Sequence, residues 1–140
     1  MLYIYSPNHE HTSHLPLVGT RVRAGFPSPA DDYIEDRLDL NEHLVSHPNA
    51  TFYVRVSGES MVNAGIQDGD ILVVDRSLDA RHEDIVIATL EGEFTVKRLV
   101  YRAAKPWLIP CNPAFPEIQL TEDMDTVIWG VVISVIHKFR

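Results

Sequence analysis

The hydrophobic pattern of the chain changes near residue 50. From there onward, short runs of β-branched and aromatic residues are separated by turn residues, which is typical of strands in an antiparallel sheet. One of these turns, Glu91-Gly92, predicts a tight hairpin in which glycine supplies a positive φ angle. We predict strands over residues 51–56, 71–75, 85–90, 94–99, 107–110 and 126–136.

Ahead of these strands, residues 1–29 are rich in proline and histidine and have no sustained period of 2 or 3.6. This pattern predicts an extended N-terminal arm, with enough Leu and Val over residues 15–22 to form a strand. Residues 28–48 are expected to be partly helical, because Ser28 and Asp39 are both suitable N-cap residues. The overall prediction is a mainly β protein with one or two short helices.

Composition and charge narrow the classes of protein to consider. A chain of 140 residues forms one domain with a sizeable core. A net charge of −8 and a pI near 5.2 argue against direct binding to nucleic acid. A single cysteine, Cys111, and the lack of a signal peptide or a long apolar run indicate a reducing, cytoplasmic protein without a membrane anchor.

Two groups of side chains could suggest a metal site. His9, His11 and His14 lie in the arm without the spaced Cys or carboxylate partners of the usual zinc patterns. The acidic residues between 31 and 39 are typical of a solvated face. We therefore predict no metal and no other cofactor.

The candidate chemistry lies in the turn Ser57-Gly58-Glu59-Ser60-Met61 and in Lys97. A serine needs a neighbouring base to act as a nucleophile at neutral pH. A lysine can be that base if burial among apolar neighbours lowers its pKa from about 10.4. Gly58 allows a sharp turn that could direct the backbone N–H of Ser60 toward a developing oxyanion.

Other interpretations of the same residues are open at this point. Ser60 and Lys97 could be a turn residue and a surface lysine with no chemical role. A Ser/His/Asp site could recruit His82 with Asp84, or His137, although no Gly-x-Ser-x-Gly motif is present. Cys111 has no nearby base in the sequence and is expected to be inert.

The motifs along the chain resemble the LexA/UmuD family of self-cleaving Ser/Lys peptidases, over about residues 24–137. Six segments carry the resemblance: Ala24-Gly25, Phe26-Pro27-Ser28-Pro29-Ala30, Ser57-Gly58-Glu59-Ser60-Met61, Asp68-Gly69-Asp70, Gly92-Glu93-Phe94-Thr95-Val96-Lys97-Arg98-Leu99 and Trp129-Gly130-Val131-Val132.

The resemblance implies a role for each matching residue. Ser60 matches the nucleophile, Lys97 the general base, and Ala24-Gly25 the bond that is cut. It also implies a fold like the LexA C-terminal domain, with twisted or barrel-like sheets over residues 30–140. The preceding arm, residues 1–29, would then carry the cleavage site.

The family also implies partners and a cellular role. Cleavage would be stimulated by the RecA filament on single-stranded DNA, and the product would form a homodimer that joins a UmuC-like Y-family DNA polymerase subunit in translesion synthesis. The sliding clamp is a further candidate partner. The setting would be the SOS response, in the cytoplasm.

Two other functions share parts of this pattern. A non-catalytic dimeric module could regulate a Y-family polymerase, with Ser60 and Lys97 kept as structure. A LexA-type or phage-type repressor fragment is disfavoured because only 24 residues precede Gly25, too few for a helix-turn-helix domain.

Overall fold

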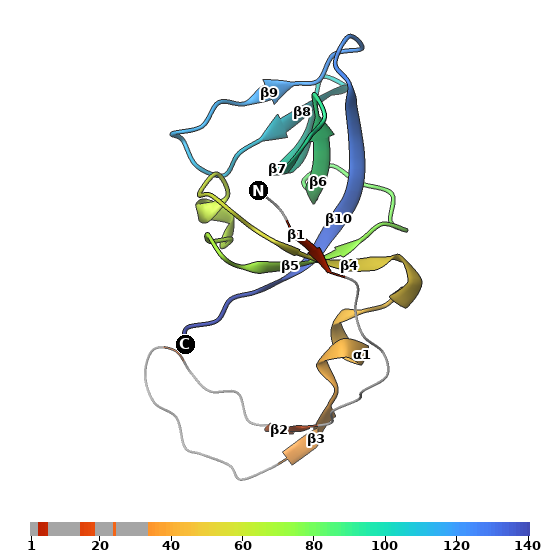
Figure 1. Ribbon diagram of the computed structural model, residues 1–140, viewed down its shortest axis with the longest axis vertical. Helices are drawn as coiled ribbons and strands as arrows, with labels where there is room; N and C mark the ends of the chain where they lie inside the picture. Colours follow the sequence, from red (N-terminus) through yellow and green to blue (C-terminus); the bar gives the residue numbers. More distant parts are fainter. Residues whose placement is uncertain (1–2, 6–14, 19–23, 25–33) are drawn as a thin grey trace. The chain divides into compact units, whose positions relative to one another are not determined.

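The structure, a computed structural model, describes residues 3–5, 15–18, 24 and 34–140 (Figure 1). The chain divides into two compact units, which are described separately. The larger unit comprises residues 1–7 and 47–140, and the smaller unit comprises residues 8–46. No helix in the described ranges has the length and apolar character needed to cross a bilayer.

The larger unit is built on one antiparallel sheet with the strand order β1-β4-β5-β10-β6-β7-β8-β9 (Figure 1). Its strands are β1 (Tyr3–Tyr5), β4 (Thr51–Arg55), β5 (Ile71–Asp75), β6 (Ile85–Leu90), β7 (Glu93–Arg102), β8 (Lys105–Ile109), β9 (Ile118–Gln119) and β10 (Thr126–Ile136). Two short 3₁₀ helices, η1 (Pro48–Ala50) and η2 (Val62–Ala64), flank β4. The prediction of a mainly β fold is confirmed.

The predicted bounds of β5, β6 and β10 agree with the structure, and Glu91 and Gly92 both have positive φ angles in the β6–β7 hairpin. Strand β7 continues three residues beyond its predicted end. It turns into β8 through Ala103 and Ala104, which also have positive φ angles. The short strands β1 and β9 were not predicted.

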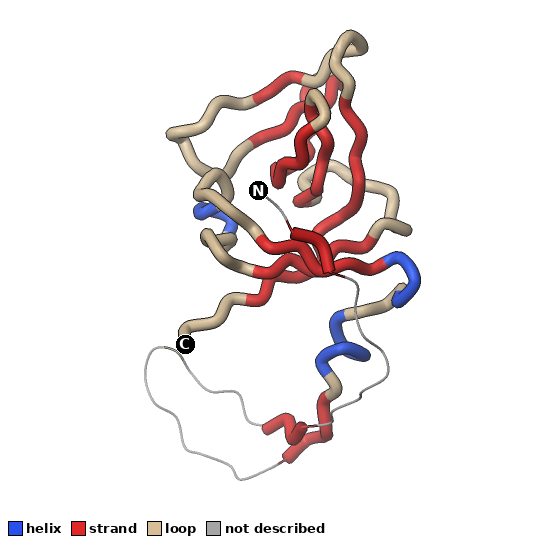
Figure 2. The backbone as a smooth tube through the Cα atoms, viewed as in Figure 1, coloured by secondary structure: helices blue, strands red, loops and turns tan. Residues whose placement is uncertain are grey.

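Strand β10 connects the two halves of the sheet. It pairs with β5 on one edge and with β6 on the other, and Figure 2 shows it running the length of the strongly curved sheet. Its register shifts between Ile128 and Gly130 and again between Val132 and Ser134. A bulge adds curvature to a strand, so these two irregularities help β10 follow both halves.

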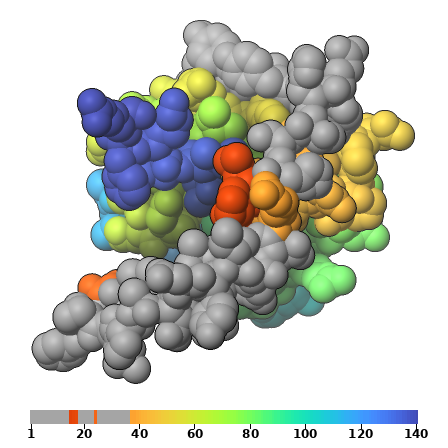
Figure 3. All heavy atoms as spheres, turned by 90° about the horizontal axis from the view of Figure 1, so that it is seen from below, coloured from red at the N-terminus to blue at the C-terminus, as the bar shows by residue number. Residues whose placement is uncertain are grey.

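The core lies on both faces of β6 and β7. One cluster contains Ile87 and Val96 together with Val54, Leu72 and Met61, and the other contains Val86, Ala88, Leu99 and Leu108. Successive side chains of a strand point to opposite faces, so neighbouring residues of β6 and β7 enter different clusters. Beyond the sheet, the C-terminal residues lie on the surface (dark blue in Figure 3), where Phe139 is 96% exposed.

The smaller unit contains a two-stranded antiparallel sheet of β2 (Leu15–Val18) and β3 (Ile34–Leu38), followed by the helix α1 (Leu40–Leu44). The predicted cap is confirmed, because the Asp39 side chain accepts a hydrogen bond from the Asn41 backbone N–H. Residues 34–38, inside the segment expected to be partly helical, form a strand that pairs with β2. Ser28, the other predicted cap, lies outside the described residues.

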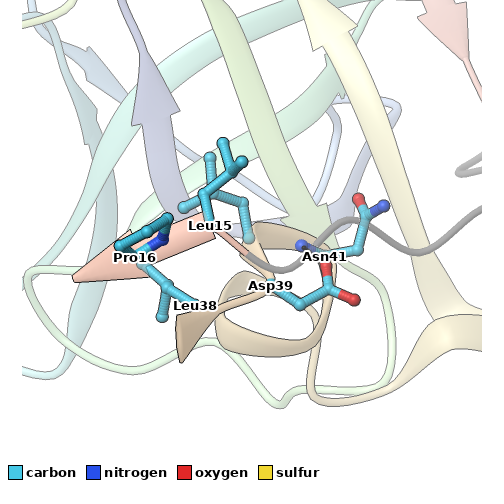
Figure 4. Close-up of a pocket in the computed structure, with 6 residues that line it drawn as sticks. Leu15, Pro16, Leu38, Asp39 and Asn41 are labelled. Atoms are coloured by element: carbon cyan, nitrogen blue, oxygen red, sulfur yellow. Dashed lines mark hydrogen bonds between the residues drawn. The ribbon is translucent and has the colours of Figure 1, made fainter. Parts of the chain in front are cut away.

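A small hollow of about 290 Å³ lies beside α1 in this unit (Figure 4). Leu15 and Pro16 of β2 and Leu38 of β3 line it, together with Asp39 and Asn41. The Leu15 side chain is 63% exposed. The hollow is a shallow apolar surface rather than an enclosed cavity.

Candidate active site

The turn that carries Ser60 follows β4 directly and is fixed by the chain that precedes β5. Gly58 has a φ angle of +103°, which only glycine adopts without strain. Its backbone N–H donates a 2.8 Å hydrogen bond to Oδ1 of Asp68. The Met61 side chain, 2% exposed, anchors the other end of the turn in the core. Ser60 is therefore held between two fixed points.

A loop after β8 supports the same turn from another direction. The side-chain amide of Asn112 donates a 2.9 Å hydrogen bond to the carbonyl oxygen of Glu59. The backbone N–H of Asn63, in η2, donates a 2.8 Å hydrogen bond to the carbonyl oxygen of Cys111. The serine turn thus contacts two segments that are distant from it in the sequence.

The structure brings Lys97 to this turn. Lys97 lies in the middle of β7 and is only 9% exposed. Its Nζ is 3.3 Å from Oγ of Ser60, 2.7 Å from Oγ1 of Thr95 and 3.1 Å from the carbonyl oxygen of Val96. Thr95 and Lys97 share a face of β7 because they are two residues apart.

Burial lowers the pKa of Lys97 below its ordinary value. Water stabilises the ammonium ion more than the neutral amine, so removing water favours the neutral form. A neutral amine has two N–H groups and one lone pair. If the carbonyl of Val96 and the hydroxyl of Thr95 accept the two N–H groups, the lone pair faces the Ser60 hydroxyl. This is the arrangement that a general base requires.

A narrow cleft of about 70 Å³ opens beside Ser60, between the serine turn and the start of β7. Phe94 forms part of its wall and packs edge-on against Trp129, with ring centroids 5.7 Å apart. The guanidinium group of Arg76 lies over the Trp129 ring, with its central carbon 4.5 Å from the ring centroid. The Phe94 ring, held by this packing, is an aromatic side chain in a cleft whose exposed lining is otherwise mainly polar.

The two histidines considered as alternative bases, His82 and His137, form hydrogen bonds with residues other than Ser60. His82 accepts a hydrogen bond from the Tyr101 backbone N–H, and His137 is hydrogen-bonded to Asp70. None of the hydrogen bonds found within the described part of the chain joins a histidine to Ser60. Cys111 is half-buried against the core.

Several predicted positions fall at or beyond the limits of the described structure. Ala24 is described and exposed, whereas Gly25 lies outside the described residues, so the geometry of the predicted scissile bond is not defined. His9, His11 and His14 also lie outside them. No group of three or more metal-ligating side chains occurs among the residues that are described.

Three residues of the site were not singled out from the sequence. Thr95 could have been found, since it lies two residues from Lys97 in a predicted strand and must share its face. Asp68 was named only as part of a motif, and its contact with Gly58 spans 10 residues, whereas the contact of Asn112 with Glu59 spans 53. Nothing local in the sequence indicates either pairing.

Comparison with known proteins agrees with this site. The Peptidase S24-like family matches residues 16–133. The chain is 50% identical to protein ImpA of Salmonella typhimurium over 134 residues, which cover 96% of this chain and 91% of ImpA. It is 51% identical to protein MucA of Escherichia coli over 119 residues, 84% of this chain and 81% of MucA. It is also 41% identical to the LexA repressor of Pseudomonas chlororaphis over 127 residues, 90% of this chain and 62% of that repressor. The chain therefore belongs to the Peptidase S24-like family of serine peptidases and, within it, to the LexA/UmuD group.

Proposed function

We propose that the protein is a self-cleaving serine peptidase in which Ser60 is the nucleophile, Lys97 is the general base and the bond between Ala24 and Gly25 is cut. The observation that carries this proposal is the 3.3 Å contact between Nζ of a buried lysine and Oγ of a serine on a fixed turn. Family membership supports the reaction class, and the Ala24 side chain is exposed.

The proposed reaction moves one proton between Ser60, Lys97 and the leaving amine. Oγ of Ser60 attacks the carbonyl carbon of Ala24 while its proton passes to the neutral amine of Lys97. The negative oxygen of the tetrahedral intermediate is stabilised by the Ser60 backbone N–H. When the intermediate collapses, Lys97 returns the proton to the amine of Gly25, which leaves. Water, activated by Lys97, then hydrolyses the ester between Ser60 and Ala24.

Because the proposed substrate is part of the protein itself, the reaction can proceed even with a weakly activated nucleophile. Holding the scissile bond in the same assembly as the nucleophile replaces a bimolecular encounter and gives a high effective concentration. The reaction can then be controlled by whatever favours docking of the arm. In this proposal the RecA filament on single-stranded DNA is that stimulus.

The biological role rests on the LexA/UmuD resemblance. Cleavage releases residues 1–24 and leaves residues 25–140 as the active form, which dimerises in the cytoplasm and joins a UmuC-like Y-family polymerase in SOS mutagenesis. The sliding clamp is the further candidate partner. A net charge of −8 fits a protein that acts through protein partners rather than by contacting DNA.

The test is mass spectrometry of the purified full-length chain incubated at about pH 10, where more of Lys97 is neutral. The wild-type protein should lose residues 1–24, whereas Ser60→Ala and Lys97→Ala should stay intact. If the wild type also stays intact after addition of RecA, single-stranded DNA and a nucleotide, the peptidase proposal fails. The non-catalytic dimeric module is then the better interpretation.

A further inference from the structure

The loop that follows β8 contacts the serine turn through the side chain of Asn112. The Asn112 Nδ2 donates a 2.9 Å hydrogen bond to the Glu59 carbonyl oxygen, and its Oδ1 accepts a 3.0 Å hydrogen bond from the Ala114 backbone N–H. The second bond fixes which end of the side-chain amide is the acceptor. The donor end must therefore face Glu59.

The carbonyl that Asn112 holds belongs to the same peptide group as the Ser60 N–H. No cis peptide bond occurs in the described ranges, so the carbonyl and the N–H of this group point in opposite directions. Fixing the Glu59 carbonyl on the Asn112 side consequently directs the Ser60 N–H away from it. No hydrogen bond found among the described residues uses that N–H.

Two separate hollows beside the turn are consistent with the opposite directions of the Glu59 carbonyl and the Ser60 N–H. Ser60 lines the 70 Å³ cleft, which Thr95 and Phe94 also line. Asn112 lines a different hollow of about 450 Å³, together with Asn63 and Cys111. The residue that holds the Glu59 carbonyl therefore lines one hollow, whereas Ser60, which carries the N–H of the same peptide group, lines the other.

We propose that Asn112 is a positioning residue for cleavage: by holding the Glu59 carbonyl, it orients the Ser60 N–H toward the oxyanion that forms in the reaction. The inference rests on the proposed function. Asn112 touches neither the substrate nor Lys97. The Val62 backbone N–H donates a second hydrogen bond to the same carbonyl, at 3.3 Å, which is longer than the 2.9 Å bond from Asn112.

The variant that isolates this role is Asn112→Asp. An aspartate keeps the acceptor for the Ala114 N–H, and with it the local turn, but it has no N–H to donate to Glu59. Its second carboxylate oxygen would instead repel that carbonyl. Asn63→Asp is the matched control, because it adds the same charge to the same hollow at a side chain without a hydrogen bond to the serine turn.

The experiment measures first-order cleavage of the full-length chain at a pH where the wild-type rate has reached its plateau. Asn112→Asp should cleave at least about tenfold more slowly than wild type, since displacing one oxyanion donor is costly. Asn63→Asp should stay within about twofold of wild type. The midpoint of the pH–rate profile should be the same in Asn112→Asp and Asn63→Asp, because each variant adds one carboxylate to the same hollow.

A second measurement separates the oxyanion donor from the nucleophile. In a Ser60→Cys background, alkylation of the introduced thiol by iodoacetamide depends on its thiolate form, which the neighbouring Lys97 favours, and uses no oxyanion donor. Peptide mapping distinguishes this thiol from Cys111. Adding Asn112→Asp should change this alkylation rate by less than about twofold. Equal cleavage losses in Asn112→Asp and Asn63→Asp, no loss in either, or a parallel loss of alkylation would overturn the inference. If the wild-type protein does not cleave at all, the proposed peptidase function itself is refuted.

Discussion

Replacing Thr95 by valine tests how the amine of Lys97 is oriented. The two side chains have nearly the same shape, so the change removes the 2.7 Å hydrogen bond to Nζ and little else. A neutral amine that has lost this acceptor can turn one N–H toward Ser60, and in those molecules the lone pair points elsewhere. A hydrogen bond of this kind contributes about 1 kcal/mol, which corresponds to a plateau rate five- to tenfold lower.

The same substitution changes the pH dependence in a defined direction. The ammonium form loses a stronger, charge-assisted hydrogen bond than the neutral amine does, so the pKa of Lys97 falls further below its ordinary value. Cleavage requires the neutral amine, so the rate rises with pH through that pKa and then levels off. Thr95→Val should therefore have a lower plateau that is reached at lower pH.

The assay is the first-order rate of cleavage of the full-length chain, followed by mass spectrometry from about pH 6 to about pH 10. Thr95→Ser keeps the hydroxyl and should stay within about twofold of wild type. A Thr95→Val profile that coincides with wild type would show that Thr95 does not orient the amine. A wild-type rate that does not vary between about pH 7 and pH 10 would refute lysine as the base.

Two further predictions concern stability. Replacing Ala103-Ala104 by Asn-Gly should raise the free energy of unfolding by about 1 to 2 kcal/mol in urea denaturation, because alanine is strained at positive φ and Asn-Gly is not; an unchanged value would mean that the turn is unstrained. Burial raises the pKa of Asp75, but hydrogen bonds from Ser77 and His47 outweigh it and hold the pKa below its ordinary value. Asp75 therefore stabilises the fold at neutral pH, and this contribution is lost as the pH falls through the folded-state pKa. Asp75→Asn should be less stable at neutral pH and lose less stability in acid, and parallel acid profiles would contradict this assignment.

The sequence predicted the strands that have clear local boundaries. β5 is a short apolar run between acidic turn residues, and Glu91-Gly92 has the chemistry of a two-residue hairpin. The β7–β8 hairpin has no such signal, because Ala103 and Ala104 are ordinary residues in an unusual conformation. The ends of both strands were consequently misplaced.

The strand at residues 34–38 was not predicted, although it lies inside the segment that was expected to be partly helical. The segment forms a strand because it pairs with β2, and that partner is distant in the sequence. Local pattern cannot reveal such a partner, since strand formation depends strongly on tertiary context.

In the candidate site, too, some features could be predicted from local sequence and others could not. Ser60 and Lys97 could be proposed from motifs, and the structure places their side chains in contact. The support for the turn could not be predicted, because 53 residues separate Glu59 from Asn112. Sequence reasoning identified the reacting groups, whereas the contacts that fix their orientation required the fold.

The place of β10 in the sheet has a consequence for the newly made protein. The strands next to the serine turn, β4 and β5, lie on one side of β10, and β7, which carries Lys97, lies on the other side with β6. Residues 126–136 follow all other strands in the sequence, so they are the last of the sheet to leave the ribosome. Until they do, the two halves of the sheet have no common strand to join them. For the self-cleavage proposed above, we therefore expect the Ser60–Lys97 pair to form only after the last strand has been made.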